Sequence, residues 1–363
     1  MQTFDKNFKA QEFAHNTYQE VFYQDGENVR IYGLGWYAEN QSFARLPQSS
    51  IQTLASVNPK LNYLSKHTSG VSMHFYTTSS VLHIQSSISE FADLPQMSQL
   101  GQAGFDCYVG SSYDDLQFFD SFRPNLKEMK VDAVVSLQSS QKKLVVLYFP
   151  LYSQVTSLRL FVEKNSVVCL PVKLPNPKRI AIYGTSITQG GCASRPGLSF
   201  VNILSRKMQC EWINLGFSGN GFGEKEVAQI VACLPSIDMF ILDYEANSGT
   251  NKKLEQTLEE FITILRNQHN SAKIVVVSRI PYLFDKIHPN LGSVREQIRV
   301  FQENLVYTLQ RNNLDQNLFY INGSLFYDED FHEYTVDSIH PNDLGFMKIA
   351  EGFLRELNQI LID

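Results

Sequence analysis

The chain of 363 residues contains no uninterrupted apolar run of about 18 residues, the length that a membrane-spanning helix needs. Its net charge is only −6, and lysine and arginine form no cluster, so neither a membrane nor nucleic acid is an expected partner. Residues 1–20 do not combine a basic segment with a following apolar one, so no secretory leader is recognised and a cytoplasmic location is expected. These absences predict a soluble globular protein that is long enough for two domains.

Cysteine is also scarce, with five residues at wide and irregular spacings and no CxxC pair. This pattern predicts reduced, mostly buried thiols rather than a disulfide framework. Cys192 lies shortly after Ser186 and allows two interpretations, a reactive nucleophile or a small core residue. Unpaired cysteines are more commonly the latter.

The first half of the chain has the pattern of an all-β domain. Between about residue 29 and residue 168, short runs rich in Val, Ile, Tyr and Phe alternate with polar turns, and no helical pattern of comparable strength interrupts them. The spacing predicts an antiparallel sandwich or jelly roll. The expected strands are residues 29–34, 71–76, 81–85, 105–109, 144–149 and 158–162.

A linker is predicted at residues 170–178, which contain three prolines and cannot form a central strand or a helix interior. We therefore expect an N-terminal β-sandwich domain over residues 1–175 and a second domain over residues 176–363.

The second half of the chain alternates strand and helix patterns. Apolar residues with helical spacing, such as Leu254, Leu258, Phe261 and Leu265, separate the strands, and similar patterns cover residues 294–309 and 344–362. Such alternation predicts a doubly wound, five-stranded parallel sheet with right-handed crossovers. The expected strands are residues 179–183, 211–216, 239–244, 273–279 and 318–321.

Ser186 is the candidate nucleophile of this second half. It follows the first of these strands and precedes Gly190 and Gly191, so the strand would deliver its hydroxyl to the mouth of a loop. A serine that attacks an ester needs a base, a group that orients the base, and hydrogen-bond donors for the oxyanion.

His340 is the candidate base, because it stands in the sequence DSIHP just before the last amphipathic segment. Asp337 precedes it on the same loop and can accept the imidazole Nδ1 hydrogen while Nε2 faces outward. The alternative is that Asp337 or Asn342 only caps the last helix.

Two stretches can supply oxyanion donors. Gly219 lies in the glycine-rich sequence NLGFSGNGFG, whose backbone N–H groups can turn toward a ligand, and Asn247 ends the sequence FILDYEAN. The alternatives are a tight turn for the first and a helix N-cap for the second. Ser186, Gly219, Asn247 and His340 nevertheless follow four different predicted strands, so all are expected at the carboxyl edge of one parallel sheet.

The blocks GTSITQG, NLGFSGNG, DYEAN and DSIHP resemble the four sequence blocks of the SGNH hydrolase, or GDSL-type esterase, superfamily over roughly residues 179–352. GGCASRPG, together with ARLP at residues 44–47 and GFDCY at residues 104–108, resembles the GDSL-like acylhydrolases that carry a β-rich N-terminal domain. The resemblance implies a flavodoxin-like catalytic domain without metal or cofactor. It also implies Ser186, Asp337 and His340 as catalytic residues and the Ser186 amide, Gly219 and Asn247 as the oxyanion hole.

Two blocks depart from the superfamily pattern. Thr185 stands where aspartate is common, and the third block lacks the usual Gly-x-Asn-Asp before Asn247. The chain also differs from α/β-hydrolases, because no G-x-S-x-G motif surrounds Ser186.

The expected reaction is hydrolysis of short acyl esters, foremost O-acetyl groups on carbohydrate, and the expected partner is a small-molecule or oligosaccharide ester. An acyl hydrolase or acyltransferase acting on a non-carbohydrate ester is the alternative, and a binding protein without turnover is a further one. Oligomeric state, including a homo-oligomer, is left open. Aromatic residues near the expected catalytic edge can stack on a sugar or belong to the core: Tyr244, Tyr282, Phe284 and Tyr334.

Overall fold

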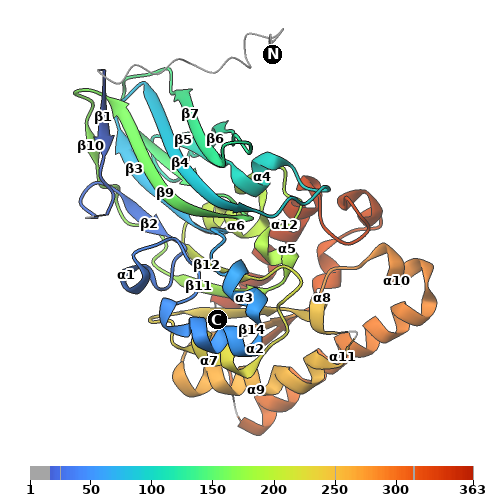
Figure 1. Cartoon of the computed structure of the whole chain (residues 1–363). Helices are drawn as coiled ribbons and strands as arrows, with labels where there is room; N and C mark the ends of the chain where they lie inside the picture. Colours follow the sequence, from blue (N-terminus) through green and yellow to red (C-terminus); the bar gives the residue numbers. More distant parts are fainter. Residues whose placement is uncertain (1–16, 25, 250, 314, 363) are drawn as a thin grey trace.

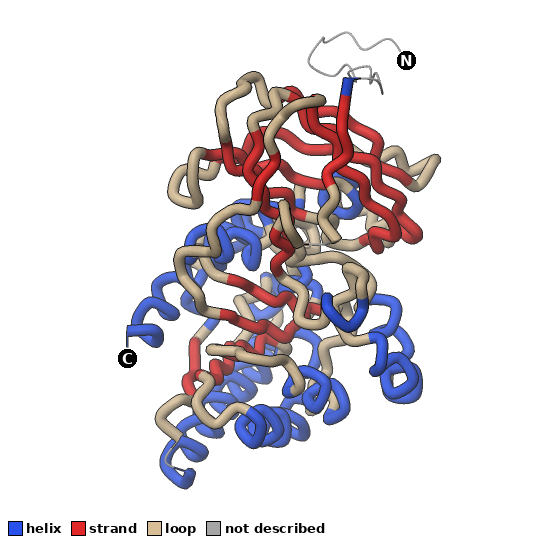
Figure 2. Tube along the Cα trace, turned by 90° about the vertical axis from the view of Figure 1, so that its left-hand side faces the viewer, coloured by secondary structure: helices blue, strands red, loops and turns tan. Residues whose placement is uncertain are grey.

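The computed structural model describes residues 17–24, 26–249, 251–313 and 315–362. Figures 1 and 2 show a β-rich part, built by the first half of the chain, stacked on an α/β part built by the second half. Residues 1–16, which belong to the segment where no secretory leader is recognised, lie outside the described residues. Within the described residues, no helix combines the length and apolarity needed to cross a membrane.

The β-rich part contains strands β1 (Tyr18–Val21), β2 (Arg30–Tyr32), β3 (Ser72–Thr77), β4 (Val81–Phe91), β5 (Phe105–Gly110), β6 (Gln117–Phe122), β7 (Lys130–Ser136), β8 (Lys143–Tyr148), β9 (Ser153–Glu163) and β10 (Val168–Cys169). They form two antiparallel sheets, with the orders β1-β9-β4-β7 and β10-β3-β8-β5-β6, and β2 pairs with β3. Alternate side chains such as Phe75 on β3 and Ile84 on β4 fill one shared core. The predicted all-β N-terminal domain is confirmed.

The strands that the sequence pattern missed are β1, β6, β7 and β10, and all four lie at the ends of the two sheets. β6 reads QFFDSF and carries exposed or half-exposed side chains over its first four positions, and β7 is also only partly buried. A strand at a sheet edge is ordered by pairing with one neighbour rather than by burial. Its side chains therefore need not alternate between apolar and polar.

Helices also occur in the first half, where the pattern indicated none of comparable strength: α1 (Tyr37–Asn40), α2 (Ile51–Val57), α3 (Pro59–Leu64) and α4 (Gln99–Ala103). Leu54 on α2 and Leu61 on α3 are almost fully buried, yet they pack in the core of the α/β part against residues such as Val227. Their apolar partners lie far away in the sequence, so the short local pattern was too sparse to predict a helix.

The α/β part is built on strands β11 (Arg179–Gly184), β12 (Glu211–Gly216), β13 (Met239–Asp243), β14 (Lys273–Val277) and β15 (Leu318–Ile321). Their order is β12-β11-β13-β14-β15, and every neighbouring pair is parallel. The predicted five-stranded parallel sheet is confirmed. Its strands are buried on both faces, as expected when helices cover both sides.

The helices of this part are α5 (Ser186–Gln189), α6 (Phe200–Met208), α7 (Lys225–Ala232), α8 (Glu245–Ser248), α9 (Lys253–Gln268), α10 (Leu283–Ile287), α11 (Pro289–Asn313) and α12 (Asp343–Ile362). On one face of the sheet, Ile182 packs with Phe200 of α6 and Phe353 of α12. On the other face, Tyr183 packs with Phe261 of α9, with ring centroids 4.9 Å apart. Successive residues of β11 thus face opposite helical layers, which is the doubly wound architecture.

Residues 170–178 form neither helix nor strand. The division of the chain into residues 1–175 and 176–363 stays a prediction. Trp36 and Leu64 of the first half belong to the core of the α/β part, so the two parts share apolar packing as well as a covalent connection.

Arg45 joins the two parts by hydrogen bonds. Its side chain is buried, and its guanidinium donates to the carbonyl oxygens of Leu64 (2.7 Å), His67 (2.7 Å), Asn214 (3.1 Å) and Gly216 (2.7 Å). Burial lowers the pKa of Arg45 to about 9, so the group stays charged at neutral pH. One cation therefore holds the segment before β3 against the end of β12.

We expect Arg45→Met to lower the free energy of unfolding by about 3 kcal/mol, because it leaves buried carbonyl groups without donors. Urea unfolding measures this change. Arg159→Met is the matched control: its side chain is 54% exposed and pairs with Glu20, so the cost should stay below about 1 kcal/mol. Equal losses in the two variants would contradict the assignment of Arg45 as a link between the two parts.

Candidate active site

Ser186 is presented by a sharp turn at the end of β11. Thr185 follows the strand and Ser186 is the first residue of the short helix α5. Gly184 is required at this turn, since a Cβ there would lie 2.0 Å from the hydroxyl oxygen of Thr188 and 2.9 Å from the carbonyl oxygen of Asp243. Ser186 remains 9% exposed, so its hydroxyl stands at the surface end of an otherwise buried helix.

His340 lies on the loop between the 3-10 turn η6 (Phe331–Tyr334) and α12. Its Nε2 is 2.9 Å from Ser186 Oγ, and its Nδ1 is 2.7 Å from Asp337 Oδ2. The second carboxylate oxygen of Asp337 accepts the N–H groups of His340 (2.7 Å) and Ile339 (3.1 Å). Partial burial by itself would raise the pKa of Asp337, but the hydrogen bonds from His340 outweigh it and hold that pKa below its usual value.

The structure therefore brings three predicted site residues, Ser186, Asp337 and His340, into one hydrogen-bonded chain. The residue that caps α12 is Asn342 and not Asp337, because Asn342 Oδ1 accepts the N–H of Gly345 in the first turn of this helix. The Asp337 carboxylate is thus engaged with the imidazole and with the backbone of its own loop.

The Gly219 loop follows β12 and has a left-handed turn at Gly219 (φ 66°). A Cβ at this position would meet no atom within 4 Å, so the backbone angle rather than crowding favours glycine. The loop is anchored on both sides of the turn: Ser218 N–H donates to Gln189 Oε1 at 2.9 Å, and Asn220 N–H donates to the Phe217 carbonyl at 3.0 Å.

Asn247 lies within α8, directly after β13, and faces the same loop. With its amide oriented to satisfy its neighbours, Oδ1 accepts the backbone N–H groups of Asn220 (3.1 Å) and Gly221 (3.3 Å). The amide nitrogen is then left as a donor on the opposite side of the group. The N-cap of the following helix α9 is Lys252, so Asn247 does not serve that helix as a cap.

Gln189 is a support residue that sequence reasoning missed. Its fully buried amide contacts His67 Nδ1 (3.0 Å) and the Leu151 carbonyl (3.1 Å) on the β-rich part, while its oxygen binds the Ser218 N–H. Ser69 donates to the Gln189 carbonyl at 2.6 Å. The only sequence signal was the position of Gln189 within the block GTSITQG; its partners come from the other half of the chain.

Asp243 is a second missed residue. Its carboxyl group accepts a hydrogen bond from Thr188 Oγ1 at 2.8 Å, and Thr188 Oγ1 in turn accepts the N–H of Thr185 at 3.3 Å. Burial raises the pKa of Asp243 to about 7. Thr185 occupies the place where the superfamily commonly has aspartate, so here a carboxyl group reaches the serine turn from the neighbouring strand β13.

The remaining candidates divide between core and surface. Burial, with the charge of Asp337, raises the pKa of Cys192 to about 12, so this thiol is protonated and unsuited to be a nucleophile. Tyr244 and Tyr334 are buried, which removes them as sugar platforms. Tyr282 and the exposed Phe284 line a groove of about 170 Å³ beside Ala246, the residue before Asn247.

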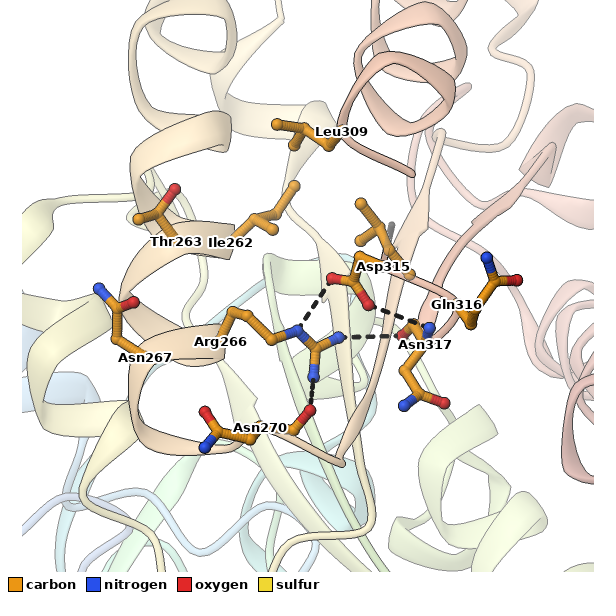
Figure 3. A pocket seen from close by; sticks show the side chains of 10 residues that line it. Ile262, Thr263, Arg266, Asn267, Asn270, Leu309, Asp315, Gln316 and Asn317 are labelled. Atoms are coloured by element: carbon orange, nitrogen blue, oxygen red, sulfur yellow. Dashed lines mark hydrogen bonds and ion pairs between the residues drawn. The ribbon is translucent and has the colours of Figure 1, made fainter. Parts of the chain in front are cut away.

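A larger pocket, of about 430 Å³, lies at the opposite edge of the sheet, where β14 and β15 begin (Figure 3). Arg266 crosses it and donates to the Asp315 carboxylate (2.9 Å) and to the backbone carbonyls of Ala272 (2.7 Å) and Asn317 (3.2 Å). Because these groups satisfy one another and the pocket is remote from Ser186, we assign it no part in the chemistry.

Comparison with known proteins agrees with this architecture. The sequence model of the GDSL-like lipase/acylhydrolase family matches residues 177–358. A second model, described as the N-terminus of SGNH-hydrolase-type esterases, matches residues 21–168. A comparison with curated proteins found no match.

Several solved structures are similar over almost the whole chain. A protein described as a GDSL-like lipase of Bacteroides ovatus is 29% identical, with a TM-score of 0.85 and coverage of 95% of this chain and 98% of that one. The salicylyl-acyltransferase SsfX3 of a tetracycline biosynthetic pathway is 21% identical, with a TM-score of 0.72 and coverage of 94% and 97%. A family two carbohydrate esterase of Cellvibrio japonicus is 14% identical, with a TM-score of 0.59 and coverage of 95% and 98%.

The fold and the family match together define a carboxylic ester hydrolase with an SGNH-type parallel sheet and an N-terminal β domain. The chain belongs to the GDSL-like lipase/acylhydrolase family. The family resemblance seen in the four sequence blocks is thereby confirmed.

The raised pKa of Asp243 predicts a pH-dependent stability. Because the folded state holds this proton up to a pH of about 7, whereas an unfolded aspartate releases it near pH 3.8, the contribution of Asp243 to stability falls as pH rises through this interval. Between pH 5 and pH 8, wild-type protein should lose roughly 2–3 kcal/mol of unfolding free energy relative to Asp243→Asn. Urea unfolding of both proteins at the two pH values tests this; a constant difference would refute it.

Proposed function

We propose that this protein hydrolyses short acyl esters through an acyl-enzyme on Ser186, with His340 as general base and Asp337 as the group that orients it. The observation that carries the proposal is the continuous hydrogen-bonded chain from Ser186 Oγ to His340 (2.9 Å) and from His340 to Asp337 (2.7 Å). These distances allow a proton to pass from hydroxyl to imidazole without rearrangement of the loop.

In the first half-reaction, Ser186 Oγ attacks the acyl carbon while its proton moves to His340 Nε2. The ionised Asp337 stabilises the imidazolium that forms. His340 then donates the proton to the leaving alcohol, and the acyl group stays on Ser186. In the second half-reaction, His340 deprotonates a water molecule that attacks the acyl carbon, and it then returns the proton to Ser186 Oγ as the acid is released.

The tetrahedral oxyanion would be bound by the N–H groups of Ser186 and Gly219 and by the amide nitrogen of Asn247. The case for Asn247 is that its amide oxygen is engaged by Asn220 and Gly221, which leaves the nitrogen as the free donor. Gly219 is supported by its place in the left-handed turn between Ser218 and Asn220, whose own N–H groups anchor the loop.

For the substrate we propose an O-acetylated oligosaccharide. The internal space behind the serine turn, lined by Thr185, Ile187 and core side chains such as Phe353, measures only about 20 Å³, so it gives a long acyl chain no room. The groove with Tyr282 and Phe284 offers apolar surface beside Asn247 for a sugar ring. A family two carbohydrate esterase of Clostridium thermocellum with the same fold was solved in complex with cellohexaose.

A second candidate is acyl transfer to, or hydrolysis of, a non-carbohydrate ester. The observation that favours it is the likeness to the salicylyl-acyltransferase SsfX3, whose TM-score of 0.72 exceeds the 0.59 of the Cellvibrio japonicus carbohydrate esterase. The two candidates share the serine chemistry and differ in the alcohol that the site accepts.

Ser186→Ala and His340→Ala should each remove most of a kcat advantage of about 10⁶, because neither attack nor proton transfer can then proceed normally. Asn247→Ala should lose less, about 10²–10³, as expected for one oxyanion donor. Turnover of an aryl acetate measures all three losses, and labelling by a fluorophosphonate checks Ser186 directly. Full turnover by Ser186→Ala would sink the proposal.

Acetate release should be faster, in kcat/KM, from acetylated xylo-, manno- or pectic oligosaccharides than from aryl acetates of similar reactivity. Mass spectrometry of the products identifies the sugar that has lost its acetyl group. Efficient turnover of aryl esters alone, with every acetylated oligosaccharide unchanged, would favour the non-carbohydrate candidate.

A further inference from the structure

Cys192 lies beside the pair formed by Asp337 and His340. One ligating atom from each of the three side chains lies within 4.8 Å of the other two. Among the residues that the structure describes, this is the only such group of three His, Cys, Asp or Glu side chains. Cys192 plays no part in the proposed ester chemistry, so its position next to the base calls for a separate explanation.

The backbone holds Cys192 in this place. The chain turns back after α5 with Gly190 and Cys192 both in the left-handed region, at φ values of 99° and 77°. Gly191 N–H donates to the Ser186 carbonyl at 2.7 Å, and a Cβ on Gly191 would lie 3.5 Å from Cδ2 of the His340 ring. The turn therefore passes directly against the imidazole and brings the thiol to it. A cysteine, unlike glycine, adopts such a φ only at a cost in energy.

The three side chains are ligands that Zn²⁺ prefers. Thiolate, imidazole and carboxylate bind zinc at about 2.0–2.3 Å, so in a tetrahedral site the ligating atoms stand roughly 3.3–3.8 Å apart. Zinc binding would draw the three ligating atoms together from separations of up to 4.8 Å. A fourth position would remain for water.

The charges also favour a divalent cation. The Asp337 carboxylate accepts hydrogen bonds from His340 Nδ1 (2.7 Å) and from the backbone N–H groups of His340 (2.7 Å) and Ile339 (3.1 Å), so it is the anionic member of the group. A dication offsets the carboxylate and displaces the thiol proton to solvent, which turns the thiol into a thiolate ligand.

We propose that Cys192, Asp337 and His340 bind Zn²⁺, and that the bound ion inhibits the enzyme reversibly. Coordination occupies the base and the carboxylate that orients it, so His340 cannot take the proton of Ser186. The ion is an inhibitor and supplies no step of catalysis, in keeping with the absence of a catalytic metal implied by the family resemblance.

Cobalt binding tests the site without any turnover. Co²⁺ bound to a thiolate has a ligand-to-metal charge-transfer absorption. This absorption is measured while Co²⁺ is added to the full-length protein. Wild type should show this absorption at one equivalent of Co²⁺, and Cys192→Ser should lose it. Cys233→Ser, which alters an exposed cysteine, is the matched control and should retain it. His340→Gln should weaken Co²⁺ binding at least tenfold, which gives a second test if the cysteine variant fails to fold.

Inhibition tests the consequence. Zn²⁺ should inhibit wild-type ester turnover, a chelator should restore it, and Cys192→Ser should need at least tenfold more zinc for half inhibition relative to its own metal-free rate. Equal zinc sensitivity of the two proteins, or equal cobalt absorption, would overturn the proposal. The inhibitory role of zinc rests on the proposed ester chemistry, whereas metal binding at Cys192, Asp337 and His340 is independent of it. Ser186→Ala should keep the cobalt absorption, so failure of the metal site and failure of the serine mechanism are distinguishable.

Discussion

The open edge of the parallel sheet is the constraint on which the rest of the structure depends. β12 lies at the end of the sheet and has a strand neighbour on one side only. Arg45 donates to its carbonyl groups at Asn214 and Gly216, just before the Gly219 loop begins. An edge strand with unsatisfied carbonyl groups would be unstable and prone to pair with other chains. The first half of the chain therefore completes the α/β part as well as forming its own sandwich.

This coupling continues into the active site. Gln189 links the helix that carries Ser186 to the loop that carries Gly219, and it is itself held by His67 and Leu151 of the β-rich part. Tyr152 donates to the carbonyl of Ser186 at 3.3 Å. A helix of only four residues has little stability of its own. The contacts from the β-rich part therefore hold Ser186 and the Gly219 loop in fixed positions relative to each other. They favour a supporting role for the β-rich part over that of a detached recognition module.

The immediate surroundings of Ser186 combine several polar groups, buried and exposed, whose protonation depends on their neighbours. Burial raises the pKa of Asp243 to about 7, and burial together with the charge of Asp337 raises the pKa of Cys192. Partial burial opposes ionisation of Asp337, but its hydrogen bonds with His340 hold its pKa below the usual value. The proposed ester chemistry would use one part of this set, and the proposed metal binding would compete for the same atoms.

The sequence by itself determined the doubly wound sheet, the sandwich and the candidate residues Ser186, Gly219, Asn247, Asp337 and His340. It could do so because buried central strands, amphipathic helices and glycine-rich turns leave local patterns, and because strand order fixes which turns share an edge. The catalytic roles of these residues stay predictions. Only the tertiary structure revealed the four edge strands, the helices α2 and α3, and the supporting contacts of Arg45, Gln189 and Asp243. Each of these depends on a partner distant in the sequence, so no local pattern could indicate it.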